Sequence, residues 1–393
     1  MVLQLLTSEA LDFRLSRLDV LMADAGIDTI FINDNANLFY LTGRVFCGYL
    51  MYRRDSRELR AFVRRPVTFT GKDVVSIHKP EQIAEHLDAP LGKTALETDN
   101  SPYSTVIRLA AALGLESFGN ADAILRKARS VKAPDEIALI EHSGICQARV
   151  YTDMHRLYHE GMTDVELQIE IERASRLEGC LGIFRIGGNE MELYMGNVIT
   201  GENADAPSPY DFAMGGAGQS PSLPVGANGT VIEPANPVMV DVNGNYTGYM
   251  TDMTRTYAVD PEHMSDEIKR IHQVSVNICA KLADMGRPGA KASDLYDQAL
   301  KMACEAGLEK IFMGHRQHAG FVGHGVGIEI NELPVISPRS RDILFAGNVI
   351  ALEPKFVIPR VGAVGIENTY VVEPDGPMRC LTNAPMRILP LSY

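Results

Sequence analysis

Two glutamates end apolar runs of the kind found in buried strands, and their placement constrains this chain more than any other feature. Glu353 ends the run Val349-Ile-Ala-Leu-Glu, and Glu367 ends the run Val361-Gly-Ala-Val-Gly-Ile-Glu. Burying a carboxylate without a partner costs on the order of several kcal/mol, so each glutamate needs a compensating charge. Lys355 could supply that charge for Glu353, but nothing basic lies beside Glu367 in the sequence. A bound metal ion is the simplest explanation for both.

Two aspartates flank a predicted turn. Asp241 ends the run Val238-Met-Val-Asp, and Asp252 precedes Met-Thr-Arg-Thr, with glycine and asparagine at positions 243–248 between them. This composition predicts two antiparallel strands joined by a loop near residues 243–248. On one face of such a hairpin, each aspartate could bind the same pair of cations from its own strand. The alternative is a pair of solvated strand carboxylates.

His324 lies among Gly323, Gly325 and Gly327, which would let a metal ion approach the backbone closely. A single histidine of this kind is also common as a purely structural residue. Four carboxylates converging with one imidazole would repel one another unless they held cations, and their oxygens suffice to bridge two divalent ions. The sequence therefore predicts a two-metal hydrolase.

Composition sets the remaining bounds. The chain has 393 residues, of which 46% are hydrophobic, and its net charge is -13. The length favours two domains. The acidic balance and the lack of a basic stripe argue against a nucleic-acid partner. We expect no membrane partner, since no apolar run reaches the roughly 18 residues that a bilayer requires. The first residues do not resemble a signal peptide, and the six cysteines form no C-x-x-C pair, so a cytoplasmic location is expected.

The pattern along the chain predicts two parts. A helix from residue 13 that ends at Gly26, a strand at Thr29-Ile-Phe-Ile, strands near 61–63 and 73–77, and helices near 80–87 and 104–113 together predict an α/β module. A long helix from Pro134 to about His159 and a second helix at 163–178 follow. We place the boundary at about residue 132, which gives domains 1–132 and 133–393.

In order and spacing the five residues resemble the pita-bread metallopeptidases, which include prolidase, aminopeptidase P, methionine aminopeptidase and the metal-free creatinase. The family pattern is an Asp, a second Asp eleven positions later, a His in a Gly-His-Gly setting, a Glu before Pro and a final Glu, and the chain matches all of them. The segment Asn37-Leu-Phe-Tyr-Leu-Thr-Gly resembles the N-terminal domain of the prolidase-like members. The resemblance covers essentially the whole chain. It implies an α/β N-terminal domain followed by an α+β pita-bread catalytic domain.

Four departures from the family lie at positions around the metal ligands, where family members bind substrate or move protons. Gly320 and Asn331 stand where prolidases and aminopeptidases P carry histidines, Ser222-Leu-Pro-Val replaces a Pro-His pair, and Gly365 replaces an arginine. These departures leave the metal chemistry intact but put Xaa-Pro dipeptide specificity in question. His315 and His318, on the segment before His324, could take over one of the missing roles.

The resemblance implies a hydrolase that cleaves a peptide or amide bond near a free amino terminus, with proline in the second position as one candidate specificity. The expected metal ligands are Asp241, Asp252, His324, Glu353 and Glu367, with Asp252 and Glu367 bridging two divalent ions. Manganese or cobalt is expected, and zinc or iron would also fit. Glu353 and His324 are the expected catalytic residues, with Glu353 carrying a proton to the leaving nitrogen.

Two alternative functions remain open. One alternative is a creatinase-like hydrolase of a non-peptide C–N bond, and the other is a non-catalytic binding protein. We expect a small peptide or amide substrate. We also expect a homodimer in which the N-terminal domain covers the neighbour's active site, partly because Asn37–Gly43 is predicted as an apolar, strand-like segment.

Overall fold

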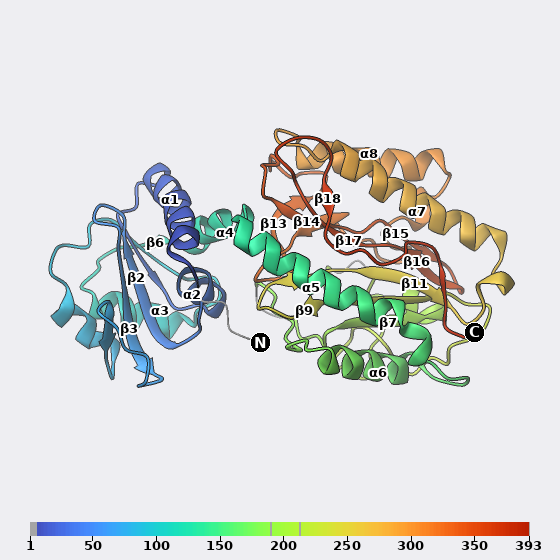
Figure 1. Cartoon of the computed structure of the whole chain (residues 1–393), viewed down its shortest axis with the longest axis horizontal. Coiled ribbons are helices and arrows are strands. Elements are labelled where there is room, and N and C mark those ends of the chain that lie inside the picture. Colours follow the sequence, from blue (N-terminus) through green and yellow to red (C-terminus); the bar gives the residue numbers. More distant parts are fainter. Residues whose placement is uncertain (1–5, 189–190, 212–213, 393) are drawn as a thin grey trace. The chain divides into compact units, whose positions relative to one another are not determined.

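The computed structural model describes residues 6–188, 191–211 and 214–392, and the chain divides into two compact units. The first unit is Met1–Arg129 and the second is Ser130–Tyr393, so the division falls three residues before the boundary proposed from the sequence. Figure 1 colours the elements of both units along the chain. Among the helices in the described ranges, none is long and apolar enough to cross a membrane.

The first unit is built on a mixed sheet of six strands in the order β4-β3-β2-β1-β5-β6. Its strands are β1 (Thr29–Ile32), β2 (Cys47–Arg53), β3 (Glu58–Arg65), β4 (Val74–Ser76), β5 (Thr94–Leu96) and β6 (Gly119–Asn120). Its helices are α1 (Ser8–Asp24), α2 (Asn35–Thr42), the 3-10 helix η1 (Pro80–His86), α3 (Tyr103–Ala112) and α4 (Asp122–Ser130). The predicted alternation of strands and helices is confirmed, and Phe31, Phe62 and Leu109 belong to its buried core.

The prediction for Asn37–Gly43 was wrong, because this segment is helix α2 rather than a strand. The Asp34 side chain accepts a hydrogen bond from the Ala36 amide and caps the start of the helix. Gly43 ends the helix with a φ of 68°, a left-handed conformation that favours glycine. The apolar residues of a short buried helix gave the same local signal as a buried strand.

Four α-helices lie around the strands in the described part of the second unit (Figure 1). They are α5 (Pro134–Thr152), α6 (Asp164–Leu177), α7 (Asp266–Met285) and α8 (Ala292–Glu305). Helix α6 begins with the predicted capping box, in which the Thr163 hydroxyl accepts from the Glu166 amide and the Glu166 carboxylate accepts from the Thr163 amide. Helix α5 ends earlier than predicted, because a 3-10 turn at Met154–Arg156 follows it and buries Met154 in the core.

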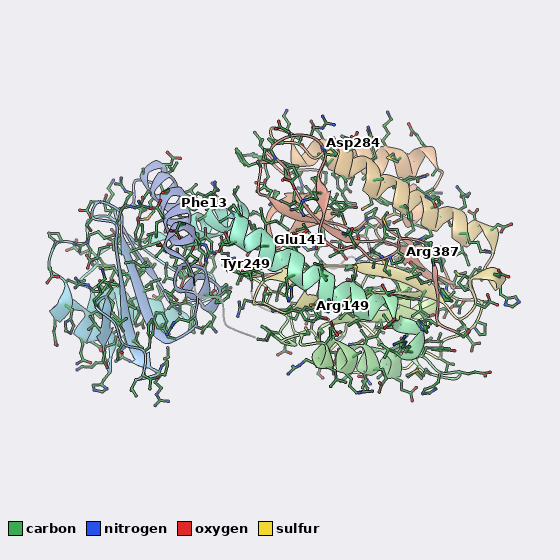
Figure 2. The ribbon with its side chains drawn as sticks, in the orientation of Figure 1. Phe13, Glu141, Arg149, Tyr249, Asp284 and Arg387 are labelled. Carbon is green, nitrogen blue, oxygen red and sulfur yellow. The ribbon has the colours of Figure 1, made fainter. Side chains whose placement is uncertain are left out.

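Ion pairs join α5 to its surroundings. Glu141 and Arg149 are both labelled on this helix in Figure 2. Glu141 pairs with Arg379 at 2.6 Å, and Arg149 pairs with Glu178 at the end of α6 at 2.8 Å. Both pairs are largely accessible to solvent, so each contributes little to stability.

The strands of the second unit form two larger sheets and two hairpins. The larger sheets have the orders β19-β11-β8-β7 and β13-β12-β14-β17-β18, and the hairpins are β9-β10 and β15-β16. The strands of the first larger sheet are β7 (Gly196–Thr200), β8 (Val238–Val242), β11 (Thr254–Ala258) and β19 (Leu389–Pro390). Those of the second are β12 (Gly323–Gly325), β13 (Glu332–Ile336), β14 (Val349–Leu352), β17 (Asn368–Val371) and β18 (Arg379–Cys380). The hairpin strands are β9 (Gly244–Asn245), β10 (Met250–Thr251), β15 (Lys355–Ile358) and β16 (Gly362–Gly365).

Gly144 marks a close approach of α5 to the C-terminal segment. A Cβ atom at this position would lie 2.2 Å from the Leu381 carbonyl oxygen, which is backbone and cannot rotate away. We expect Gly144→Ala to lower the free energy of unfolding by about 1–3 kcal/mol, although alanine is the better helix former. Chemical denaturation measures the change. His142→Ala, at an exposed position of the same helix, is the control, and equal stability of the two variants would contradict the close contact.

Candidate metal centre

The five predicted residues come together where the strands of the second unit meet. Asp241 lies in β8, His324 lies at the centre of β12, and Glu353 lies between β14 and β15. Asp252 lies between β10 and β11, and Glu367 lies between β16 and β17. The predicted hairpin is confirmed, since β8 and β11 pair antiparallel and place Thr254 opposite Asp241.

All four carboxylates are buried. Asp241, Asp252, Glu353 and Glu367 are between 1% and 8% exposed, so the alternative of solvated strand carboxylates is excluded. His324 faces three of them through Nε2, which lies 3.3 Å from Glu353 Oε1, 3.8 Å from Asp252 Oδ2 and 4.0 Å from Glu367 Oε1. These separations are close to those between neighbouring ligands of one ion, about 3 to 3.5 Å when metal–ligand bonds are about 2.0–2.2 Å.

A lysine lies among the same carboxylates. Lys355 is fully buried, and its Nζ donates to Asp241 Oδ2 and Glu353 Oε2, each at 2.8 Å, and to Glu367 Oε2 at 3.3 Å. The expectation that nothing basic lies beside Glu367 was therefore wrong. Sequence neighbours of Glu367 are uncharged, but strand β15 pairs with β16 and carries Lys355 across to it. The pairing of Lys355 with Glu353 is confirmed.

The electrostatics of the cluster follow from burial and from this lysine. Burial alone would lower the pKa of Lys355, but attraction by the surrounding carboxylates outweighs it and holds that pKa well above its usual value. Burial would raise the pKa of Glu353, yet Lys355 and His324 bring it down to about 2. Burial and repulsion by Asp241 raise the pKa of Asp252 to about 7, and burial with repulsion by Asp252 raises the pKa of Glu367.

His324 is oriented for ligation by a backbone carbonyl. Its Nδ1 donates to the Gly325 oxygen at 3.1 Å, which leaves the lone pair of neutral Nε2 directed at the carboxylates. Burial would lower the pKa of His324, but contact with Glu353 raises it to about 9 when no cation is bound. An ion bound at Nε2 would therefore displace a proton that the bare carboxylates favour.

The residues fit a metal ion on the His324 side of the cluster. Glu353 Oε1 and Glu367 Oε1 are buried and have no hydrogen-bond partner among the described residues. Such oxygens are rare in proteins unless an ion or water binds them. Asp252, His324 and Glu367 each offer a ligand atom within 4.8 Å of the others. A ligand set of carboxylate oxygens and one imidazole suits manganese, iron, cobalt or zinc. It differs from the thiolate ligands of a zinc site built from cysteines.

Two threonines hold these ligands and were not predicted. The Thr254 hydroxyl donates to Glu367 Oε2 at 2.7 Å. The Thr369 hydroxyl accepts from the Asp252 amide and donates to the Asp252 carbonyl, each at 2.9 Å. Neither contact had a signal in the sequence, because the partners lie 113 and 117 positions apart along the chain.

Asn331, which replaces a family histidine, and the two suggested substitutes His315 and His318 all bind residues outside the five-residue cluster. Asn331 exchanges two hydrogen bonds with the Gly187 backbone, at 2.7 and 2.8 Å. His315 binds Asp205 at 2.9 Å, and His318 binds the Phe312 carbonyl at 2.9 Å. No contact in the described part of the chain brings either histidine to the five-residue cluster. The suggested replacement of a missing histidine by His315 or His318 therefore has no structural support.

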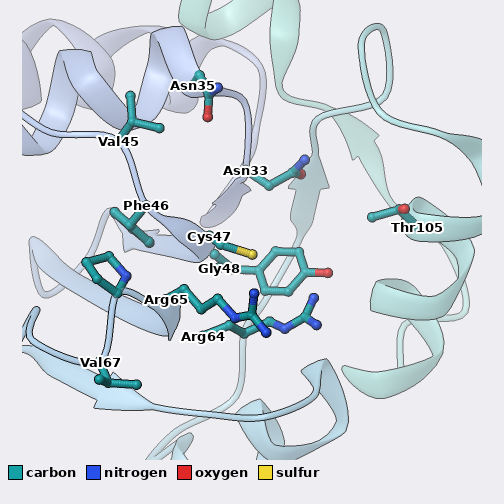
Figure 3. Close-up of a pocket in the computed structure, with 12 residues that line it drawn as sticks. Asn33, Asn35, Val45, Phe46, Cys47, Gly48, Arg64, Arg65, Val67 and Thr105 are labelled. Carbon is teal, nitrogen blue, oxygen red and sulfur yellow. The ribbon is translucent and has the colours of Figure 1, made fainter.

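The first unit contains a hollow of its own. It has a volume of about 900 Å³ and is lined from β2 and β3 by residues that include Cys47, Tyr49, Arg64 and Arg65 (Figure 3). It contains no acidic side chain among its lining residues, so it offers no ligand set for a cation.

Comparison with known proteins agrees with the site. Residues 138–374 match the model of metallopeptidase family M24, and residues 14–131 match the creatinase/prolidase N-terminal domain. The chain is 25% identical to an Xaa-Pro dipeptidase of Pyrococcus horikoshii, with 90% of this chain and 92% of the relative covered. It is 26% identical to an Xaa-Pro dipeptidase of Pyrococcus furiosus, with 93% of this chain and 97% of the relative covered.

The fold also matches solved structures. The Xaa-Pro dipeptidase from Bacillus anthracis superposes with a TM-score of 0.78 at 22% identity, covering 96% of this chain and 99% of that one. The predicted fold class, an α/β N-terminal domain with a pita-bread catalytic domain, is confirmed. The chain belongs to metallopeptidase family M24 and is a metal-dependent peptidase.

Proposed function

We propose that this peptidase cleaves small peptides near their free amino terminus, using divalent metal held by Asp252, His324, Glu353 and Glu367. The observation that carries the proposal is the pair of buried, unpartnered oxygens, Glu353 Oε1 and Glu367 Oε1, beside His324 Nε2. The names of the relatives from the two Pyrococcus species support a substrate of the Xaa-Pro peptide class. Manganese or cobalt is the proposed ion, and zinc or iron would also fit the ligands.

The chain's own residues supply orientation and charge. A divalent ion in such a site polarises the scissile carbonyl and makes bound water acidic enough to attack near neutral pH. His324 is fixed by Gly325, and Glu367 is fixed by Thr254, so both ligands are aligned before substrate binds. Burial would raise the pKa of Glu353, but Lys355 and His324 lower it, which favours the ionised carboxylate that a ligand requires. The role of Glu353 as proton carrier stays a prediction.

The experiment compares metal-free protein with protein reloaded with manganese on Gly-Pro-Ala and its N-acetylated form. We expect metal-dependent release of the first residue from the free peptide and no cleavage of the blocked one. Cleavage of neither peptide, with or without metal, would refute the function. Equal cleavage of both would show that the free amino terminus is not recognised.

We expect dipeptides of the Xaa-Pro type to be poor substrates. A prolidase must bind the free carboxylate of the dipeptide, which needs a positive charge or strong donors near the ligands. Gly320, Asn331 and Gly365 provide no charge, and Arg339 and Arg341 are exposed. Loss of one charge-assisted contact lowers kcat/KM by roughly 10- to 100-fold.

The measurement is kcat/KM on Ala-Pro and Leu-Pro beside Gly-Pro-Ala, with manganese present. Turnover of both dipeptides near the ordinary enzyme range of about 10⁴ M⁻¹s⁻¹ or above would contradict this prediction.

A second candidate is hydrolysis of a non-peptide C–N bond, as in creatinase. The uncharged residues at positions 320, 331 and 365 favour it, because they remove the groups that would hold a peptide carbonyl and carboxylate. Adding non-peptide amides and cyclic amidines to the same panel separates the two candidates. The homodimer, the domain boundary at residue 132 and the cytoplasmic location stay predictions.

A further inference from the structure

Lys355 uses its whole hydrogen-bonding capacity on the ligand cluster. An ammonium group has three N–H donors, and here they reach three carboxylates, those of Asp241, Glu353 and Glu367. The side chain is 0% exposed. Like a metal ion, this ammonium neutralises the negative charge of the carboxylates, and an unneutralised charge would be costly to bury.

The two glutamates divide their oxygens between two cationic places. Each gives Oε2 to Lys355, while each Oε1 lies within 4.0 Å of His324 Nε2 and has no hydrogen-bond partner in the described part of the chain. Asp241 contacts the ammonium through Oδ2. Asp252 contacts His324 instead, with Oδ2 at 3.8 Å from Nε2. The ammonium therefore lies on one side of the cluster, and the unpartnered oxygens Glu353 Oε1 and Glu367 Oε1 lie on the other side, near His324.

The backbone fixes Lys355 in this place. Lys355 is opposite Gly365 in the β15–β16 pair. A Cβ at position 365 would lie 2.8 Å from the Pro354 oxygen, 2.9 Å from Lys355 Cα and 3.0 Å from Lys355 Cγ. Glycine at 365 therefore leaves the room that the lysine stem occupies. The Lys355 carbonyl also accepts from the Met313 amide at 2.9 Å, which holds the start of β15.

We propose that the Lys355 ammonium takes the place of one of the two divalent ions that the five-residue pattern predicts, so that the chain binds a single ion between Asp252, His324, Glu353 and Glu367. Asp241 then holds the lysine rather than a metal. A second dication cannot bind the oxygens that Lys355 occupies, because it would meet a positive charge at hydrogen-bonding distance. The inference rests on the proposed function, which needs only one ion.

The first test counts ions in the unmodified protein. Metal-free protein is titrated with manganese, and tightly bound ion is measured per chain by elemental analysis and by electron paramagnetic resonance. We expect one equivalent and the hyperfine spectrum of an isolated ion. Two equivalents with the broadened spectrum of a coupled pair would overturn the inference, and so would the absence of tight binding.

The second test removes the ammonium. Lys355→Gly should open the second place and raise tight binding to two equivalents, with a coupled spectrum. Lys310→Gly makes the same change at an exposed lysine and should keep one equivalent. A folded Lys355→Gly protein that still binds one ion would refute the substitution of ammonium for metal. If Lys355→Gly does not fold, the count in the unmodified protein still decides.

The inference and the proposed function can fail separately. Two bound ions together with metal-dependent cleavage of Gly-Pro-Ala would reject the single-ion centre and retain the function. One bound ion without cleavage of any peptide would retain the single-ion centre and reject the substrate class.

Discussion

Replacing Glu367 by glutamine is expected to abolish tight binding of divalent metal and to lower kcat/KM by well over 100-fold. Like Glu353, Glu367 has contacts on both sides of the cluster, through Oε2 to Lys355 and Thr254 and through the unpartnered Oε1 near His324. Changing an outer-sphere partner of a metal typically costs about 10–100-fold in affinity or activity, and loss of a charged ligand should cost more. Glutamine keeps the shape, so the effect isolates the charge.

Calorimetric titration with manganese and kinetics on Gly-Pro-Ala check this prediction together. Glu373→Gln is the matched control, because Glu373 lies six residues along the same segment and pairs with Arg379 near the surface. The control should bind metal as the unmodified protein does. Unchanged metal affinity in Glu367→Gln would show that the cluster is not the metal centre.

The fold could be predicted where local pattern and tertiary context agree. The strand at Thr29–Ile32 and the capping box at Thr163 have signals that depend on a few neighbouring residues, and both are confirmed. The segment Asn37–Gly43 shows the limit, because a short and mostly buried apolar segment can form a helix or a strand with the same composition. The cap by Asp34 decides the outcome, and it lies outside the apolar run that was interpreted.

The site shows a different limit. Apolar runs pointed to Glu353 and Glu367, a predicted hairpin to the two aspartates, and flanking glycines to His324. The structure brings all five together. The number of cations could not be predicted in the same way. From sequence proximity alone, Lys355 pairs only with Glu353. The β15–β16 register also brings Lys355 to Glu367. Strand pairing is a long-range property, so the partner of a buried charge is not visible from its sequence neighbours.

The substitution Lys355→Met is expected to destabilise the metal-free protein by about 3–5 kcal/mol, the usual cost of removing one partner of a buried ion pair. Methionine keeps an unbranched side chain of similar length but leaves the carboxylates of Asp241, Glu353 and Glu367 without their cation. A loss of this size lowers the melting temperature by on the order of 10 °C. Thermal unfolding in a chelating buffer gives the value.

Manganese should stabilise Lys355→Met more than it stabilises the unmodified protein, because the ion then replaces a missing charge as well as filling its own site. At about 100 times the dissociation constant, one bound ion adds about 2.7 kcal/mol, and a second ion would add to that. Lys132→Met is the matched control, since Lys132 forms a buried pair with Glu332 at 2.9 Å. That variant should also lose stability but gain no extra stabilisation from manganese over the unmodified protein. If Lys355→Met is as stable as the unmodified protein without metal, the ammonium does not neutralise the cluster.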